Sequence, residues 1–305
     1  LEIIRCPNCS DKLFLEDYVE THSQVENGTL ICQKCQHKFP IIKNIPRFVT
    51  NEHDLANFGF QWKLFRKTQL DSNSGLPISK NRFFTNSGWK SEELKDKLVL
   101  DVGCGSGRFT EIALSSGARV VAVDYSSSVE ACWENMPNHP NLEVVQADIY
   151  HLPFALETFD FVYCFGVLQH TPNPKEAFKA LPLQLKPTGK LAVDIYPKLF
   201  HNYFWPKYWI RLITKRLSHE RLFRIVQRLV NILLPISLFL GRIPLIGHKL
   251  KYIIPVVNYE GVYPLSQHQL WEWSVLDTFD MLSPKHDHPQ TLKYLNRWFA
   301  DVGMK

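Results

Sequence analysis

The sequence predicts an α/β protein built on a doubly wound parallel sheet, with a small cysteine-rich module before it and a mainly helical insertion behind it. Three observations carry this prediction. The apolar stretch 99–102 runs into the glycine-rich turn 103–107 and then into a helical segment, an arrangement that holds a nucleotide-like cofactor. The apolar segments 119–124 and 144–149 have the length and composition of buried parallel strands. Two Cys-x-x-Cys pairs precede all of these.

The cysteine-rich module occupies residues 1–49. Cys6 and Cys9 form one pair, Cys32 and Cys35 form the other, and 22 residues separate the pairs. Two knuckles with this spacing converge on one tetrahedral zinc ion held by four thiolates. Two disulfides are the alternative, and they are typical of oxidising compartments. The spacing favours a single structural Zn²⁺.

The glycine-rich turn differs from a dinucleotide-binding loop. Gly103, Gly105 and Gly107 form a G-x-G-x-G pattern, whereas the dinucleotide fingerprint has its third glycine at the position of Arg108. A dinucleotide site is therefore disfavoured. Asp101, two residues before the first glycine, is expected to face a cationic amine.

Acidic residues end the next two predicted strands. Asp124 lies about 20 residues after the glycine turn, where a carboxylate accepts hydrogen bonds from ribose hydroxyls. Asp148 is expected to accept a hydrogen bond from the exocyclic amine of an adenine. Tyr125, Ile149 and Phe165 complete the predicted cofactor-binding residues.

Together these residues resemble the class I S-adenosylmethionine (SAM)-dependent methyltransferases, above all the small-molecule enzymes whose first motif reads like LDVGCGSGRF. The resemblance covers residues 96–196 and rests on four motifs in order: the glycine turn, Asp124, Asp148 and the predicted fourth strand at 158–164. It implies a Rossmann-like core that binds SAM. The implied reaction transfers a methyl group to an oxygen or nitrogen of a small organic acceptor, a lipid-like one included. A domain that has lost its cofactor is the alternative. The family's K-P-G-G turn before the fifth strand reads Lys186-Pro187-Thr188-Gly189 here.

A second resemblance concerns residues 37–48, which follow the second cysteine pair. They resemble the zinc-ribbon family that activates methyltransferases, with Asn44 at the position of a family glycine. In that family the ribbon is a separate subunit, and here it is fused in cis. The implied role is structural, covering an apolar face of the catalytic domain. A ribbon that recruits nucleic acid is the weaker alternative, because its charges are mixed.

The resemblance also implies roles for two segments near the cofactor. Residues 50–95 form a helical and aromatic linker in which Gln61, Trp62 and Phe65 either line the pocket or pack in the core. The loop after the fourth strand passes the carboxyl ends of the strands, where such sheets bind ligands. Its His170 is the candidate catalytic base for an acceptor hydroxyl, and a capping or surface histidine is the alternative.

Residues 197–290, called the insertion below, are not part of the minimal fold and are predicted to form a lid that binds the acceptor. Residues 291–305 are predicted to be the last helix of the core. The aromatic side chains expected in the acceptor wall are Phe200, Tyr203, Phe204, Trp205, Tyr208 and Trp209.

A helical run is expected from about Ser218 to Leu234, with Pro235 interrupting the apolar stretch 229–240. Arg221, Arg224 and Arg228 share one face of this helix. That basic stripe is read as a solvated face, with contact to RNA phosphates or to anionic lipid headgroups as alternatives.

Composition narrows the function classes. The formal charge of +5 over 305 residues does not by itself indicate a nucleic-acid partner. Neither a signal peptide nor an apolar run of about 20 residues is expected, which predicts a soluble, cytoplasmic protein. The predicted partner is a small-molecule acceptor; peripheral membrane contact, RNA methylation and a noncatalytic SAM-binding role stay as alternatives.

Overall fold

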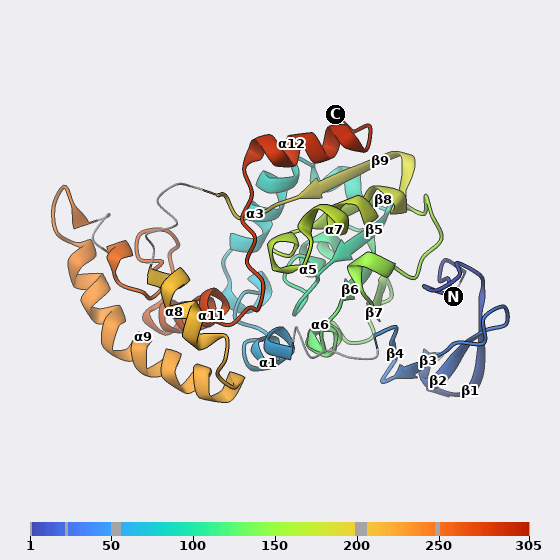
Figure 1. Cartoon of the computed structure of the whole chain (residues 1–305), viewed down its shortest axis with the longest axis horizontal. Coiled ribbons are helices and arrows are strands. Elements are labelled where there is room, and N and C mark those ends of the chain that lie inside the picture. Colours follow the sequence, from blue (N-terminus) through green and yellow to red (C-terminus); the bar gives the residue numbers. More distant parts are fainter. Residues whose placement is uncertain (1, 22–23, 50–55, 199–205, 248–250, 305) are drawn as a thin grey trace.

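The computed structural model describes residues 2–21, 24–49, 56–198, 206–247 and 251–304. In these ranges the chain forms a four-stranded antiparallel sheet, a five-stranded parallel sheet and a separate group of helices. Figure 1 shows the antiparallel sheet on the right, the parallel sheet in the centre and the helices of the insertion on the left.

The parallel sheet positions the candidate site. Its strands are β5 (Leu98–Val102), β6 (Arg119–Asp124), β7 (Leu142–Gln146), β8 (Phe159–Cys164) and β9 (Leu185–Val193). They lie in the order β7-β6-β5-β8-β9, and every pair is parallel. The strand order reverses between β5 and β8, so ligands are expected outside the carboxyl ends of these two strands. The predicted doubly wound sheet is confirmed.

Helices cover both faces of this sheet, because its strands bury apolar side chains on both sides. Val99 belongs to the buried cluster of one face and Leu100 to that of the other, as the two-residue period of a strand requires. The first face packs against α3 (Ile78–Ser87), α4 (Ser91–Leu94), α5 (Thr110–Ser115) and α6 (Ser128–Asn135). The second face packs against α7 (Pro174–Ala180) and α12 (Leu292–Asp301).

The predicted turn at residues 186–189 is instead part of strand β9. Leu185 pairs with Phe159, while Lys190 pairs with Phe161, so four residues of β9 lie opposite a single residue of β8. This irregularity bends the strand without ending it. The extra residues 186–189 therefore lie within the strand rather than ahead of it.

The amino-terminal ribbon docks on the β7 edge of the parallel sheet. Its strands are β1 (Leu13–Thr21), β2 (Gln24–Cys32), β3 (Lys38–Ile42) and β4 (Ile45–Pro46). The backbone N–H of Phe48 donates to the carbonyl of Gln146 at 2.8 Å, and Arg47 donates to the side-chain oxygen of Gln146 at 2.9 Å. Arg47 also pairs with Glu130 of α6 at 3.1 Å. The ribbon thus covers a sheet edge that would otherwise expose backbone groups.

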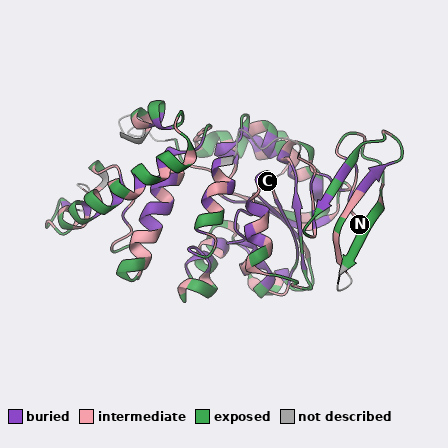
Figure 2. Ribbon diagram, turned by 90° about the horizontal axis from the view of Figure 1, so that it is seen from below, coloured by how far each residue is buried: buried purple, intermediate pink, exposed green. Residues whose placement is uncertain are grey.

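The linker and the insertion build the remaining helices. These are α1 (Ala56–Leu64), α2 (Asp71–Ser74), α8 (Pro206–Thr214), α9 (His219–Gly241) and α11 (Gln267–Leu282). Helices α9 and α11 share a buried apolar cluster with Phe65 of the linker. Figure 2 shows the burial of the helices at this end, with buried faces turned inward and exposed faces outward.

Helix α9 continues through Pro235, so the expected interruption is wrong. A proline in a helix removes one backbone hydrogen bond, but Val230 and Leu234 are buried just before it and Ser237 just after it. Packing on both sides holds the helix together.

By length and composition alone, α9 is long and apolar enough to cross a membrane. The mean hydropathy of its most apolar window is 1.6, and 28% of that window is buried inside the protein. The expectation of no apolar run of about 20 residues is thus wrong for this helix.

Candidate active site and metal centre

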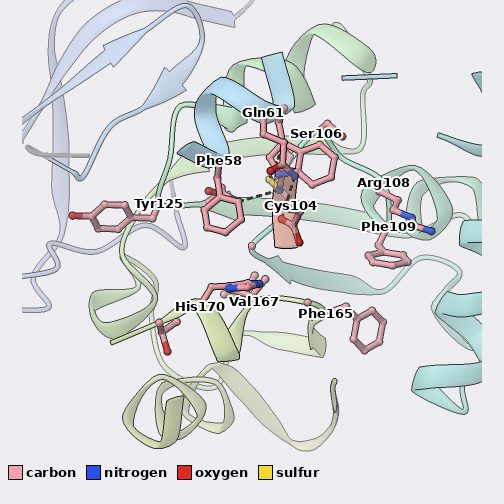
Figure 3. A pocket seen from close by; sticks show the side chains of 18 of the residues that line it. Phe58, Gln61, Cys104, Ser106, Arg108, Phe109, Tyr125, Phe165, Val167 and His170 are labelled. Carbon is pink, nitrogen blue, oxygen red and sulfur yellow. Dashed lines mark hydrogen bonds between the residues drawn. The ribbon is translucent and has the colours of Figure 1, made fainter. Parts of the chain in front are cut away.

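A cavity of about 530 Å³ lies at the carboxyl ends of β5, β6 and β8, between the sheet and the insertion. This volume is typical of small-molecule sites. The predicted site residues that the structure brings together on its wall are Gly103, Gly105, Asp124, Tyr125, Asp148, Ile149, Phe165 and His170. Figure 3 shows Phe58 and Gln61 of α1 on one side of the cavity and Val167 and His170 on the other.

The glycine turn lets the backbone come close to its neighbours. Gly103 has a φ of 84°, and a Cβ atom there would lie 2.1 Å from a methyl group of Val167. At Gly105, a Cβ atom would lie 3.0 Å from the indole nitrogen of Trp62. A side chain at either position would therefore displace the residues that close the cavity.

Asp124 fastens the glycine turn to the end of β6. Its Oδ2 accepts a hydrogen bond from the N–H of Gly105 at 3.0 Å, and its Oδ1 accepts from the N–H and the hydroxyl of Ser126, both at 2.8 Å. Burial raises the pKa of Asp124, while these hydrogen bonds oppose the shift. The Ser128 side chain adds a further hydrogen-bonding interaction with this carboxylate. Asp124 also lines the cavity, which puts the carboxylate within reach of a ligand.

Asp148 starts a short 3-10 turn after β7 and accepts a hydrogen bond from the N–H of Tyr150 at 3.0 Å. Both Asp148 and the following Ile149 line the cavity. Both residues follow β7, which pairs with β6, the strand that ends at Asp124.

The structure does not place Asp101 and Gly107 on the cavity wall. Asp101 is 2% exposed and accepts a hydrogen bond from the Thr110 hydroxyl at 2.5 Å. Burial raises the pKa of Asp101 to about 7. Asp101 shares the strand face of Val99, which packs under α3 to α6. Gly107 faces Met136 and Cys132 of α6.

His170 is buried with one ring nitrogen unpartnered. Its Nδ1 lies 3.1 Å from the carbonyl oxygen of His286, and because a carbonyl only accepts, Nδ1 carries the proton. Its Nε2 is a buried atom with no hydrogen-bond partner among the described residues. The rings of Phe58 and Tyr196 pack against the imidazole, with centroids at 5.3 Å and 5.6 Å. The fixed tautomer leaves a lone pair on Nε2 that can accept a proton.

Most of the rest of the wall comes from residues that the sequence did not single out. Burial raises the pKa of Asp277 to about 6, and this carboxylate accepts hydrogen bonds from the Tyr259 hydroxyl and from Gln69 at 3.2 Å. The insertion and the linker also supply Arg82, Arg211, Tyr263 and Trp273. No local motif marks these positions, because they come together only through tertiary packing. Asp280 and Met281 also line the cavity, and they belong to the stretch 279–284, which resembles the segment that covers the active site in small-molecule methyltransferases.

Arg108 is a buried cation on the cavity wall. Its guanidinium is hydrogen-bonded to Ser79 at 2.9 Å and to Gln69 at 2.8 Å, and it lies over the ring of Trp273 at 5.4 Å. Burial lowers the pKa of Arg108 to about 10. No carboxylate among the described residues forms an ion pair with it, and its place directly after the glycine turn is the signal that was available in the sequence.

Part of the aromatic wall expected from the insertion lies elsewhere. Trp209 is 66% exposed and is not on the cavity wall, so its predicted place there is wrong. Tyr208 is half-buried and does not line the cavity either. The others, Phe200, Tyr203, Phe204 and Trp205, lie outside the described residues. In the linker, Gln61 and Trp62 line the cavity, whereas Phe65 packs in the core of the insertion.

The four cysteines of the ribbon converge as the sequence predicts. Their sulfur atoms all lie within 4.8 Å of one another, with 3.5 Å between Cys6 and Cys35 and 3.4 Å between Cys9 and Cys32. A disulfide needs about 2.05 Å. A tetrahedral ion with Zn–S bonds of about 2.3 Å holds its sulfurs about 3.8 Å apart. The four thiols fit zinc.

Comparison with known proteins identifies two protein families in the chain. Residues 100–193 match the family described as "Methyltransferase domain", and residues 1–44 match the family described as "Trm112p-like protein". The chain joins a methyltransferase domain to a Trm112p-like zinc ribbon. Its cofactors are SAM and a structural zinc ion. The glycine turn and Asp124 on the wall of one cavity fit SAM, and the four thiols fit zinc.

Several proteins of known name are similar to this chain. The ubiquinone biosynthesis O-methyltransferase of Coxiella burnetii is 34% identical over 114 residues, covering 37% of this chain and 49% of that protein. The tRNA U34 carboxymethyltransferase of Desulfotalea psychrophila is 27% identical, covering 47% and 52%. The chain thus spans about half the length of these relatives. A solved complex of the Haloferax volcanii Trm112 methyltransferase activator with a candidate methyltransferase is 19% identical, covers 50% of this chain and 66% of that one, and has a TM-score of 0.40.

Proposed function

We propose that this methyltransferase transfers a methyl group to an oxygen or nitrogen of a small organic acceptor, and that a hydroxyl oxygen is the acceptor atom the site supports best. The observation that carries the proposal is the unpartnered Nε2 of His170 in a cavity that is partly lined by aromatic side chains. An ionisable hydroxyl is the acceptor that needs such a base.

The residues along the strand ends are proposed to hold the cofactor. Asp124 accepts a hydrogen bond from a ribose hydroxyl, while Asp148 and Ile149 border the adenine. Gly103 and Gly105 let the backbone approach the rest of the molecule, with Tyr125 and Phe165 alongside. When bound, SAM supplies an electrophilic methyl group on a sulfonium. Holding donor and acceptor in line supplies most of the acceleration.

His170 is proposed to remove the acceptor proton. Nε2 accepts the proton, and the charge that develops on the ring is stabilised because Nδ1–H already donates to the carbonyl of His286. Phe58 and Tyr196 hold the ring from its sides, so no reorientation is needed. General-base catalysis of this kind contributes about 100- to 10,000-fold in rate.

The acceptor is proposed to bind on the side of the cavity formed by the insertion. Tyr259, Tyr263 and Trp273 provide apolar area, and Asp277 and Arg108 provide polar groups that fix its orientation. This combination of apolar wall and few buried polar groups is typical of small-molecule sites.

The test uses SAM carrying a labelled methyl group, with the full-length protein, an organic-soluble cell extract and bulk tRNA as competing acceptor sources. Label in the organic-soluble fraction supports the proposal, and label in tRNA would identify an RNA methyltransferase instead. SAM binding without transfer to either would indicate a noncatalytic binding protein. In the His170→Gln variant, kcat should fall about 100-fold or more while SAM affinity stays unchanged.

A further inference from the structure

The outer side of α9 carries an apolar stripe that no described residue covers. Ile225, Ile232, Ile236 and Phe239 recur at intervals of seven, four and three residues, which places them on one side of the helix. Their exposed fractions are 37%, 64%, 44% and 71%. These four residues are called the outer stripe below.

Exposed apolar side chains concentrate in this part of the molecule. Ten of the twenty large ones in the described residues lie between positions 209 and 253. Leu245 and Ile246, in the turn after α9, are 94% and 53% exposed. Figure 1 shows α9 at the end of the molecule opposite the ribbon. Soluble proteins rarely leave an apolar surface of this extent without a partner.

The charge of the same segment is one-sided. Residues 206–249 contain nine lysines or arginines and one acidic residue, Glu220. Arg221 and Arg228 lie along the line of the outer stripe, and Arg224 lies beside it; all three are exposed. An apolar stripe bordered by arginines complements a surface that is apolar inside and anionic outside.

We infer that the outer stripe and the adjoining arginines form a docking surface for an anionic lipid bilayer, with α9 lying in the interface. The opposite side of α9 is occupied within the protein. Leu222, Val226, Val230 and Leu234 are buried against α11, so a helix that crossed the bilayer would have to give up this packing. The inference does not depend on which acceptor the site methylates.

The apolar residues distinguish a bilayer from RNA. Phosphates would engage Arg221, Arg224 and Arg228 but would leave the outer stripe in water, whereas lipid engages both. The charges distinguish a bilayer from a second copy of the chain, because two such faces would bring like charges together.

The experiment measures co-sedimentation of the full chain with phosphatidylcholine vesicles, with and without phosphatidylglycerol. The Ile232→Ser/Phe239→Ser variant removes half of the outer stripe. Its matched control is Leu156→Ser/Leu183→Ser, at positions that are 65% and 56% exposed and lie outside the insertion. The stripe variant should partition about tenfold less onto anionic vesicles, while the control stays within about twofold of the parent. Arg224→Gln/Arg228→Gln should lose the preference for anionic over zwitterionic vesicles.

Four results would overturn the inference. The first two are no sedimentation of the protein with either vesicle and equal binding of the stripe variant and the parent. The third is a concentration-dependent dimer that forms without lipid and is abolished in the stripe variant. The fourth is membrane-bound protein that resists extraction by alkaline carbonate, which indicates a spanning helix. Tight binding of bulk tRNA that the stripe variant leaves unchanged, together with weak vesicle binding, would assign the arginines to RNA. SAM affinity, measured by calorimetry without vesicles, tests the proposed function separately.

Discussion

Replacing Asp124 by alanine should weaken SAM binding by about the value of one charge-assisted hydrogen bond. This carboxylate lines the cavity and accepts hydrogen bonds from Gly105 and Ser126. We expect it to accept one more from a ribose hydroxyl of SAM. A hydrogen bond to a charged group contributes about 1.5–3 kcal/mol, which corresponds to a Kd about 10- to 150-fold higher.

Calorimetric titration with SAM measures this change directly. Because Asp124 also holds the glycine turn, the variant's fold must be checked by near-UV circular dichroism before titration. Ser126→Ala is the matched control: it removes one hydrogen bond to the same carboxylate but leaves the charge and the Gly105 contact in place. A Kd of Asp124→Ala within about twofold of the parent, in a folded protein, would refute the assignment of this residue to the cofactor.

Three further predictions concern the ribbon and the buried acid. Metal analysis of the purified protein should find about one equivalent of zinc. The Cys32→Ser variant should lose the metal, and its ribbon should unfold. Two disulfides detected by mass spectrometry would contradict this prediction. Arg47→Met should lower the free energy of unfolding by about 1–3 kcal/mol in chemical denaturation, because it removes the hydrogen bond to the side-chain oxygen of Gln146 and one of the two ion pairs of Glu130. An unchanged midpoint would show that the ribbon docks without Arg47. Burial raises the pKa of Asp101 to about 7. Between about pH 4 and 7 the native state therefore binds more protons than the unfolded state. The contribution of Asp101 to the free energy of unfolding accordingly falls as the pH rises through that window. Thermal melts across the window should therefore show a smaller loss of Tm with rising pH in Asp101→Asn than in the parent, and parallel curves would contradict the shift.

The sequence by itself determined the features that depend on local order along the chain. The glycine turn at 103–107 and Asp124 can be recognised because a strand, a turn and a helix that bind a cofactor follow one another within a few residues. The four cysteines can be assigned to zinc because their spacing alone brings two knuckles together. His170 could be placed at the strand ends, but its tautomer and its unpartnered Nε2 depend on His286, which is 116 residues away.

Tertiary structure alone decided the features that depend on contacts between distant segments. Asp277 and Tyr259 reach the cavity only because α11 packs between the sheet and α9. The periodicity of the sequence does not predict this packing. Asp101 is buried off the cavity wall, where its carboxylate accepts a hydrogen bond from Thr110 at the start of α5. Pro235 stays inside a helix because burial on both sides of it compensates for one missing hydrogen bond, an effect that intrinsic helix propensity does not contain.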